Sequence, residues 1–175
     1  RLGAPIARLV AATNANRTVP EFLDGAPWRP RPSVATLSNA MDVGAPNNWE
    51  RVSRLFGDDA AAIRTALRWG SADDGETRAA LRDLAAKGYR ADPHGAVAFD
   101  VLRRHLRDGE QGLFLATAHP AKFATTQGSE TALPPALAAA AREPLRSRAM
   151  AAGEEGGIAL RRELLALTDR SNSAS

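Results

Sequence analysis

The chain has no cysteine, few aromatic residues and only two lysines, Lys87 and Lys122. Without cysteine there is no disulfide framework, no thiolate metal site and no cysteine nucleophile. Its apolar runs are far shorter than the ~20 residues that a membrane-spanning helix needs, so the sequence predicts no membrane partner. The scarcity of lysine matters for any chemistry that requires an amine nucleophile.

The apolar content is sufficient for a folded core. The chain has 175 residues, of which 44% are hydrophobic and 25% are charged. This composition excludes a wholly disordered or fibrous chain. At roughly 150 residues per domain, the length is that of about one domain.

The charge is nearly balanced, although the isoelectric point is high. Lys and Arg number 23 against 20 Asp and Glu, a net charge of +3. The isoelectric point of about 10.1 follows from the preference for arginine, which does not titrate in the accessible range. Acidic residues alternate with basic ones, as in Arg82-Asp83 and Arg107-Asp108. No basic face is indicated, and nucleic acid is not an expected partner.

The first residues read as the end of a helix. Gly3 and Pro5 follow Arg1-Leu2 in the order typical of a helix stop. We therefore expect the chain to be a piece of a longer protein. No charged-then-apolar leader is visible, which predicts a cytoplasmic location.

Apolar runs at 6–12 and 111–118 have the length of buried strands, and each ends in threonine and polar residues. Helices are predicted over 17–23, from Pro46 to Gly57, from Asp58 through Leu67, over 73–87 and from Pro93 onward. The proline-rich stretch 26–33 and the stretch 38–46 predict irregular structure. Short helices are predicted at 134–141 and 158–167.

Strands that alternate with helices predict an α/β fold with parallel pairing. In such sheets ligands bind beyond the carboxyl ends of the strands. We therefore expect Thr13-Asn14 and Thr117-Ala118-His119 to face one site.

The histidines show no metal-ligand spacing. His105 lies on a solvated helix face, whereas His94 and His119 lie at breaks between elements, where sites are often built. No G-x-S-x-G, P-loop or G-x-G-x-x-G spacing occurs. The residues alone thus predict an α/β protein with a possible site near Thr117.

Several strings add a resemblance. Residues 117–123 (TAHPAKF), 38–43 (SNAMDV), 46–51 (PNNWER), 12–16 (ATNAN) and 92–94 (DPH) occur here in the order and spacing of the threonine synthase family. The sequence resembles the longer bacterial and fungal class of that family over residues 1–123. Residues 124–175 resemble its variable, helical C-terminal extension only loosely.

The resemblance implies the C-terminal part of a pyridoxal 5'-phosphate (PLP) enzyme of fold type II, the fold of the tryptophan synthase β chain. Such an enzyme converts O-phospho-L-homoserine and water to L-threonine and phosphate. In the family, the Schiff-base lysine and the loop that holds the cofactor phosphate lie upstream of this segment. Neither Lys87 nor Lys122 matches that lysine, so this chain alone is expected to be inactive without its N-terminal half.

The resemblance also assigns residues. Thr117 matches the threonine that hydrogen-bonds the pyridine nitrogen of the cofactor. Asp92, His94 and His119 match positions that line the pocket, and Asn14 and Asn16 are expected to orient the loop or the cofactor. Arg17 stands where many relatives carry Asp.

Phosphate recognition suits three further side chains, because amide and guanidinium groups bind phosphate oxygens. The candidates are Asn39, Asn48 and Arg51, with loop and helix capping as the competing interpretation.

Three other functions remain open at this level. One is another PLP lyase of the same fold, such as a serine or threonine dehydratase, although its relatives differ in the 38–43 and 117–123 strings. The second is a non-catalytic module that retains the scaffold. The third is arginine-driven nucleic-acid binding, which would show a steep salt dependence.

Overall fold

The structure, a computed structural model, describes residues 5–123, 132–144, 147, 149–151 and 153–172, with side chains as far as Leu165. The helix end expected at residues 1–4 and the last residues, 173–175, lie outside the described residues. The chain divides into two compact units, residues 1–134 and 135–175. The predicted domain boundary at 123/124 falls at the edge of a stretch, 124–131, that is also outside the described residues.

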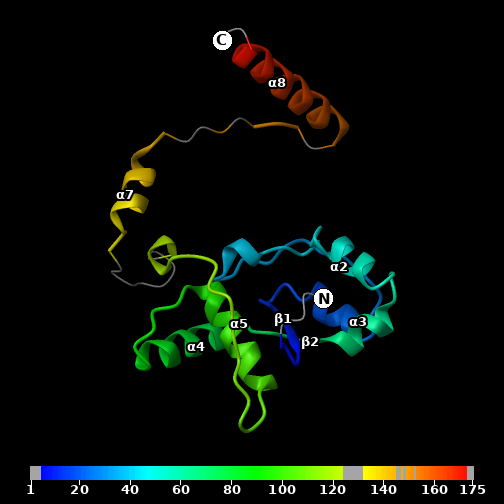
Figure 1. Cartoon of the computed structure of the whole chain (residues 1–175), viewed down its shortest axis with the longest axis vertical. Helices are drawn as coiled ribbons and strands as arrows, with labels where there is room; N and C mark the ends of the chain where they lie inside the picture. Colours follow the sequence, from blue (N-terminus) through cyan, green and yellow to red (C-terminus); the bar gives the residue numbers. More distant parts are fainter. Residues whose placement is uncertain (1–4, 124–131, 145–146, 148, 152, 173–175) are drawn as a thin grey trace. The chain divides into compact units, whose positions relative to one another are not determined.

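The first unit contains a small parallel sheet. Strand β1 is Leu9–Thr13 and strand β2 is Leu67–Ser71, with Val10 opposite Arg68 and Thr13 opposite Ser71. Helices lie between the strands in sequence and pack beside them (Figure 1). The predicted α/β class with parallel strands is confirmed.

The elements between and after the strands follow the predicted order. Their bounds are α1 Thr18–Leu23, η1 Asn39–Met41, α2 Trp49–Leu55, α3 Ala60–Ala66, α4 Asp74–Ala86, α5 Pro93–His105 and η2 Pro120–Phe123. The proline-rich stretch 26–33 has no regular secondary structure, as predicted. It is held by Trp28, whose ring stacks on Trp49 at 5.4 Å and meets Phe22 edge-on at 5.6 Å.

Strand β2 corrects the sequence analysis. The apolar spacing of Ile63 and Leu67 predicts that the third helix continues through Leu67, but α3 ends at Ala66 and the chain enters β2 directly. No glycine or proline marks this change. Pairing with β1 decides the conformation of Leu67, because strand formation depends on neighbours that are distant in sequence.

Helices α4 and α5 begin as their sequences predict. A capping box opens α4: Asp73 accepts from the Glu76 backbone N–H and Glu76 accepts from that of Asp73, both at 2.8 Å. The helix ends before Gly88, whose φ of +79° suits glycine. Asp92 caps α5, and Pro93 takes its first position.

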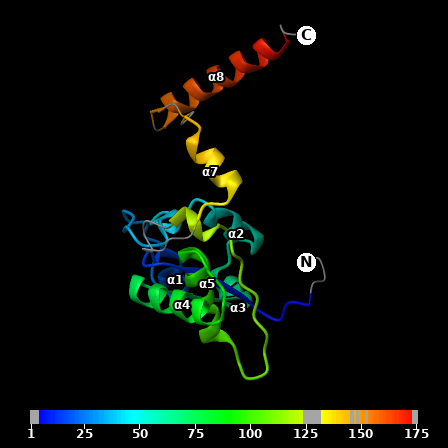
Figure 2. The same ribbon diagram turned by 90° about the vertical axis from the view of Figure 1, so that its left-hand side faces the viewer.

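Helix α5 is the central element of the core. It packs against α4 and against both strands, and α4 and α5 lie side by side in both views (Figure 1 and Figure 2). Val97 and Val101 are fully buried, as predicted, and lie with Ala72 in one cluster. Val10, Ala12 and Met41 pack around this cluster, so the core lies between α5 and β1.

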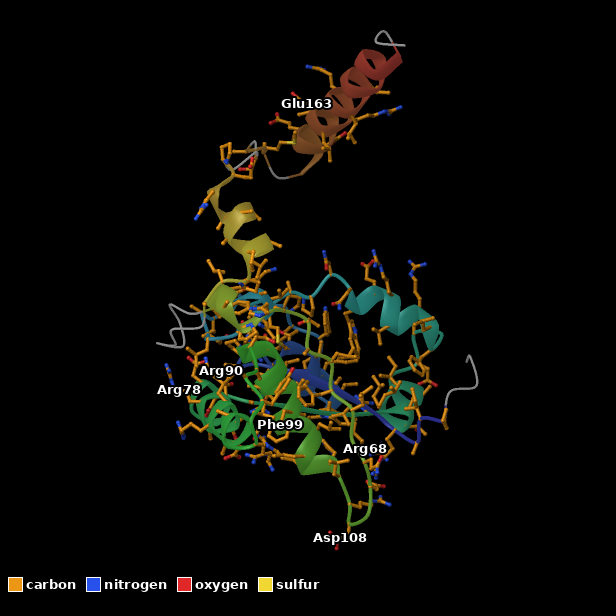
Figure 3. The ribbon with its side chains drawn as sticks, turned by 60° about the vertical axis from the view of Figure 1, so that its left-hand side comes forward. Arg68, Arg78, Arg90, Phe99, Asp108 and Glu163 are labelled. Carbon is orange, nitrogen blue, oxygen red and sulfur yellow. The ribbon has the colours of Figure 1, made fainter. Side chains whose placement is uncertain are left out.

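The strand predicted at 111–118 is wrong: no residue of this stretch pairs into a sheet in the described part of the chain. The stretch runs along α5, because Phe114 meets Phe99 at 5.8 Å and Tyr89 at 6.2 Å (Phe99 is labelled in Figure 3). The alternate residues Leu113 and Leu115 are 87% and 73% exposed. Phe114 thus packs against the helices, while its neighbours Leu113 and Leu115 lie uncovered.

Gly70 on β2 allows close packing of α5. A Cβ at this position would lie 2.9 Å from Val101 Cγ1. We expect Gly70→Ala to destabilise the fold by about 1–3 kcal/mol, the usual penalty for overpacking a core. Urea unfolding of the variant should show the loss, and Val101→Ala should relieve part of it in the double mutant.

The matched control is Gly157→Ala in the second unit, where an added Cβ meets nothing within 4 Å. An equal loss in the two variants would show that close approach to Val101 is not the cause.

The second unit contains α7, Pro135–Arg142, and α8, Glu154–Asn172 (Glu163 is labelled in Figure 3). Helices at both places were predicted, although α8 begins four residues before Ile158. Among the described helices, none has the length and apolar character to cross a membrane.

Candidate functional site

A buried polar network follows the carboxyl end of β1. Asn14 is 1% exposed, and its amide nitrogen donates to Thr36 Oγ1 and Asp42 Oδ1, both at 2.8 Å. Its amide oxygen accepts from the backbone N–H of Asn16 at 3.0 Å and from its side-chain nitrogen at 2.9 Å. Asn14 thus fixes the turn that leaves β1 and ties it to residues more than twenty positions further along.

Asp42 is the other centre of this network. Its Oδ1 accepts from Thr36 Oγ1 at 2.7 Å and its Oδ2 from the Thr36 backbone N–H at 2.9 Å. Asn16 adds a bond from its side chain to the Val34 carbonyl at 2.9 Å and accepts from the Val34 N–H at 2.8 Å. The loop 33–44 is therefore wrapped around the two asparagines. This is the loop-orienting arrangement considered for Asn14 and Asn16; contact with a cofactor stays a prediction.

A second buried polar group forms where α5 begins. Asp92 is 1% exposed and His94 is 8% exposed, and Asp92 Oδ1 lies 2.8 Å from His94 Nδ1. On its other side the imidazole accepts from the backbone N–H of Ala40, with a distance of 3.1 Å to Nε2. His94 thereby connects α5 to the loop that Asn14 and Asp42 organise.

Two buried oxygens in this region have no hydrogen-bond partner among the described residues. They are Thr13 Oγ1, at the end of β1, and Asp92 Oδ2. Buried polar atoms are nearly always satisfied, so unpaired ones are uncommon. They mark the carboxyl end of β1 and the start of α5 as the polar region of the first unit.

Thr117 and His119 lie at the end of the extended stretch. Thr117 is exposed and follows Leu113 and Leu115 at two-residue spacing, which puts it on the same uncovered face. His119 is exposed, and its Nδ1 accepts from the Ala121 N–H at 3.2 Å within η2. Within the described residues, no hydrogen bond joins Thr117 to the Asn14 network, so a single shared site stays a prediction.

The phosphate-contact candidates are all on the surface. Asn39 is exposed within η1, and Asn48 and Arg51 are exposed at the start of α2. Asn48 occupies the N-cap position without a side-chain cap bond, so the capping role considered for it is not formed. Among the described residues, no hydrogen bond joins these three side chains.

The sequence analysis missed Asp42, Thr36 and Ser38 as members of the polar network. Ser38 is 1% exposed, and its hydroxyl accepts from the Asn14 amide at 3.0 Å. The available signal was a short run of hydroxyl, amide and carboxyl residues around Asp42 in a stretch without secondary structure, which favours side-chain to backbone bonds.

Glu110, at the start of the extended stretch, has a shifted pKa and forms an ion pair. The backbone N–H of Arg107 and the nearby guanidinium of Arg8 hold the pKa of Glu110 below its ordinary value. Arg8 and Glu110 form an ion pair that ties the chain before β1 to the loop after α5 (Asp108 marks its tip in Figure 3). The entrance to the stretch that carries Thr117 is therefore anchored to β1.

Comparison with known proteins finds threonine synthases. The chain is 48% identical over 155 residues to the threonine synthase of Serratia marcescens, covering 86% of this chain and 36% of that protein. It is 52% identical over 122 residues to that of Haemophilus influenzae, covering 70% of this chain and 28% of that protein. The crystal structure of threonine synthase from Escherichia coli matches with a TM-score of 0.75 and 47% identity, over 84% of this chain and 35% of that one.

The chain is thus similar to a segment of the threonine synthases. It spans about a third of the length of the curated relatives it matches. The PLP-bound threonine synthase of Brucella melitensis also matches, with a TM-score of 0.67 and 31% identity, over 77% of this chain and 35% of that one. No protein-family model matches the sequence. The resemblance inferred from the five strings is thereby confirmed.

The two lysines of the chain show whether this segment could attach the cofactor PLP, which the Brucella melitensis enzyme contains. Covalent attachment of PLP needs a lysine amine in a pocket. Lys87 is the exposed C-cap of α4, and Lys122 is exposed in η2. Neither is enclosed, so the lysines of this segment do not fit covalent attachment of the cofactor.

Proposed function

We propose that this chain is the C-terminal part of a threonine synthase, which converts O-phospho-L-homoserine and water to L-threonine and phosphate. The observation that carries the proposal is the 47% identity and TM-score of 0.75 to the Escherichia coli enzyme over 84% of this chain. Since the chain covers 35% of that enzyme, the activity belongs to the complete protein. We propose a cytoplasmic location for that protein.

PLP, when bound by the complete protein, supplies the electron sink for chemistry at the amino-acid carbons. In this chain, the Thr117 hydroxyl is the group proposed to donate to its pyridine nitrogen. A hydroxyl is a weak acid, so it orients the ring without transferring a proton to it. The exposed position of Thr117 at the end of the uncovered face leaves its hydroxyl available for this contact.

The loop 33–44 and the start of α2 are proposed to face the substrate. Asn39 lies in a turn that is held on both sides. Its neighbour Ser38 is hydrogen-bonded to Asn14, and its neighbour Ala40 is hydrogen-bonded to His94. We propose that the amide of Asn39, together with Asn48 and Arg51, contacts the substrate phosphate, since amide and guanidinium donors suit phosphate oxygens. Asp92, His94, Asn14 and Asn16 hold these segments, and His119 is proposed to line the pocket.

The partner of this chain is proposed to be the remaining, N-terminal portion of the same protein. Leu113 and Leu115 expose an apolar face on an extended stretch that has no neighbouring strand in the described part of the chain. Pairing with a strand from the missing portion would satisfy the backbone and cover that face. The same portion would supply the lysine that this chain lacks.

The proposal is tested by assaying the complete protein with PLP. Incubation with O-phospho-L-homoserine should release phosphate and L-threonine in equal amounts, whereas L-serine and L-threonine should yield no 2-oxo acid. Formation of a 2-oxo acid without phosphate release would instead identify a dehydratase. This chain without the N-terminal portion should show no turnover, and addition of that portion should restore it.

A further inference from the structure

The buried imidazole of His94 holds one defined hydrogen-bonding state. Its Nε2 faces the backbone N–H of Ala40 at 3.1 Å, and a backbone N–H can only donate. Nε2 must therefore carry a lone pair. Nδ1 faces Asp92 Oδ1 at 2.8 Å, so the proton of the neutral ring is on Nδ1.

Asp92 fixes this tautomer from the other side. Its Oδ1 also accepts from the backbone N–H groups of His94 at 2.9 Å and Gly95 at 3.4 Å. Oδ1 thus faces three N–H groups as their acceptor, and the bond it accepts from Nδ1–H leaves Nε2 free to accept from Ala40.

The imidazole joins three segments that are distant in sequence. Residue 94 opens α5, Ala40 lies in η1 beside Asn39, and the ring of Phe123 in η2 lies 4.8 Å from the imidazole at 55°. η2 follows Thr117 directly along the chain. The hydrogen bond to Ala40 thus joins α5 to the Asn39 turn, in addition to the packing of Met41 against the cluster of Val97 and Val101.

We propose that His94 is a positioning residue, which as the neutral Nδ1–H tautomer accepts from the Ala40 N–H and holds the Asn39 turn in place beside η2. This rests on the proposed function in one respect, namely that the Asn39 turn faces the substrate phosphate. The hydrogen bond itself and its effect on the turn do not depend on that function.

Protonation of the imidazole would break the arrangement. With protons on both nitrogens, Nε2 and the Ala40 N–H would be two donors facing each other, and the turn would have to move. The charged group shown in contact with the ring is Asp92, the N-cap of α5; the loop of Ala40 and η2, which also contact the ring, contain Asp42 and Lys122. Asp42 is turned toward Asn14 and Thr36, and Lys122 is exposed.

The test measures hydrogen–deuterium exchange of residues 37–43 in the complete protein. His94→Phe keeps a flat ring but has no acceptor. In this variant, exchange of the segment should rise roughly tenfold, as expected when a part-buried hydrogen bond from a backbone N–H is lost. In His94→Gln, the amide can donate to Asp92 and accept from Ala40, so exchange should stay close to that of the unmodified protein.

Histidine 105 on the same helix provides the matched control. Its Nε2 lies 3.1 Å from the backbone carbonyl oxygen of Trp69, so this contact is made to β2 and not to the Asn39 turn. His105→Gln should leave exchange in 37–43 unchanged.

Activity separates this inference from the proposed function. We expect His94→Phe to raise KM for O-phospho-L-homoserine roughly tenfold with a smaller change in kcat, and His94→Gln to restore KM. Unchanged exchange in a folded His94→Phe protein would overturn the positioning role. If that variant does not fold, exchange of 37–43 that rises in His94→Gln as far as a lost hydrogen bond predicts would do so. A clear exchange effect in a protein that does not turn over this substrate would leave the positioning role intact and reject the proposed function.

Discussion

Replacing Thr117 with valine in the complete protein is expected to lower kcat/KM for O-phospho-L-homoserine by roughly 100-fold, the usual effect of deleting one donor in an active site. Valine has the shape of threonine but no hydroxyl, so the substitution removes the proposed donor to the cofactor nitrogen with little change in volume. Thr117 is exposed in this chain, so folding of the first unit should be unaffected. Phosphate release under steady-state conditions measures the loss.

Two companion variants define that result. Thr117→Ser retains the hydroxyl and should keep activity within a few-fold of the unmodified protein. Thr65→Val is the control for the chemical change, because Thr65 is exposed on α3 and its hydroxyl donates only to the Ala61 carbonyl at 3.0 Å. Full activity in Thr117→Val with normal cofactor absorbance would contradict the assigned role.

The helices of the first unit were predictable because their signals are local. Asp73 and Glu76 form a capping box three residues apart, and Gly88 ends the same helix. Asp92 and Pro93 open α5 in adjacent positions. Each signal acts on backbone groups within one turn, so a single sequence contains all the information that is needed.

The strands were less predictable because pairing is not local. Leu67 fits both the helix period of Ile63 and the strand that it joins, and only β1, more than fifty residues away, distinguishes the two. The opposite error occurred at 111–118, where an apolar run has the length of a buried strand but, within the described residues, pairs with no other strand. Such a run indicates that a segment is apolar and leaves the identity of its partner open.

The polar groups of the candidate site show a similar division. The position of Asn14 and Asn16 at a strand end was read from sequence, as was the position of His94 at a helix start. Their partners Asp42 and Ala40 were not, because these bonds connect residues separated by 26 to 54 positions. The family strings marked the correct segments, while the contacts between them required coordinates.

The buried amide of Asn14 predicts the largest stability effect. In Asn14→Asp, a second carboxylate would occupy the place of an amide nitrogen that now lies 2.8 Å from Asp42 Oδ1. A buried charge without compensation is costly, so we expect a loss of about 3–5 kcal/mol at neutral pH. Urea unfolding followed by the fluorescence of Trp28 and Trp49, which stack within the same unit, measures the change.

The pH dependence of this variant distinguishes charge repulsion from lost packing. Two carboxylates that share a site raise the pKa of one of them in the folded state. The folded protein then binds a proton more tightly than the unfolded chain, so the penalty is greatest at neutral pH and decreases as the pH falls toward 5. Asn47→Asp, at an exposed position, should change stability by less than about 0.5 kcal/mol. Protonation relieves repulsion between carboxylates but leaves a packing defect unchanged. If the stability loss in Asn14→Asp were the same at neutral pH and at pH 5, lost packing rather than charge repulsion would therefore be its cause.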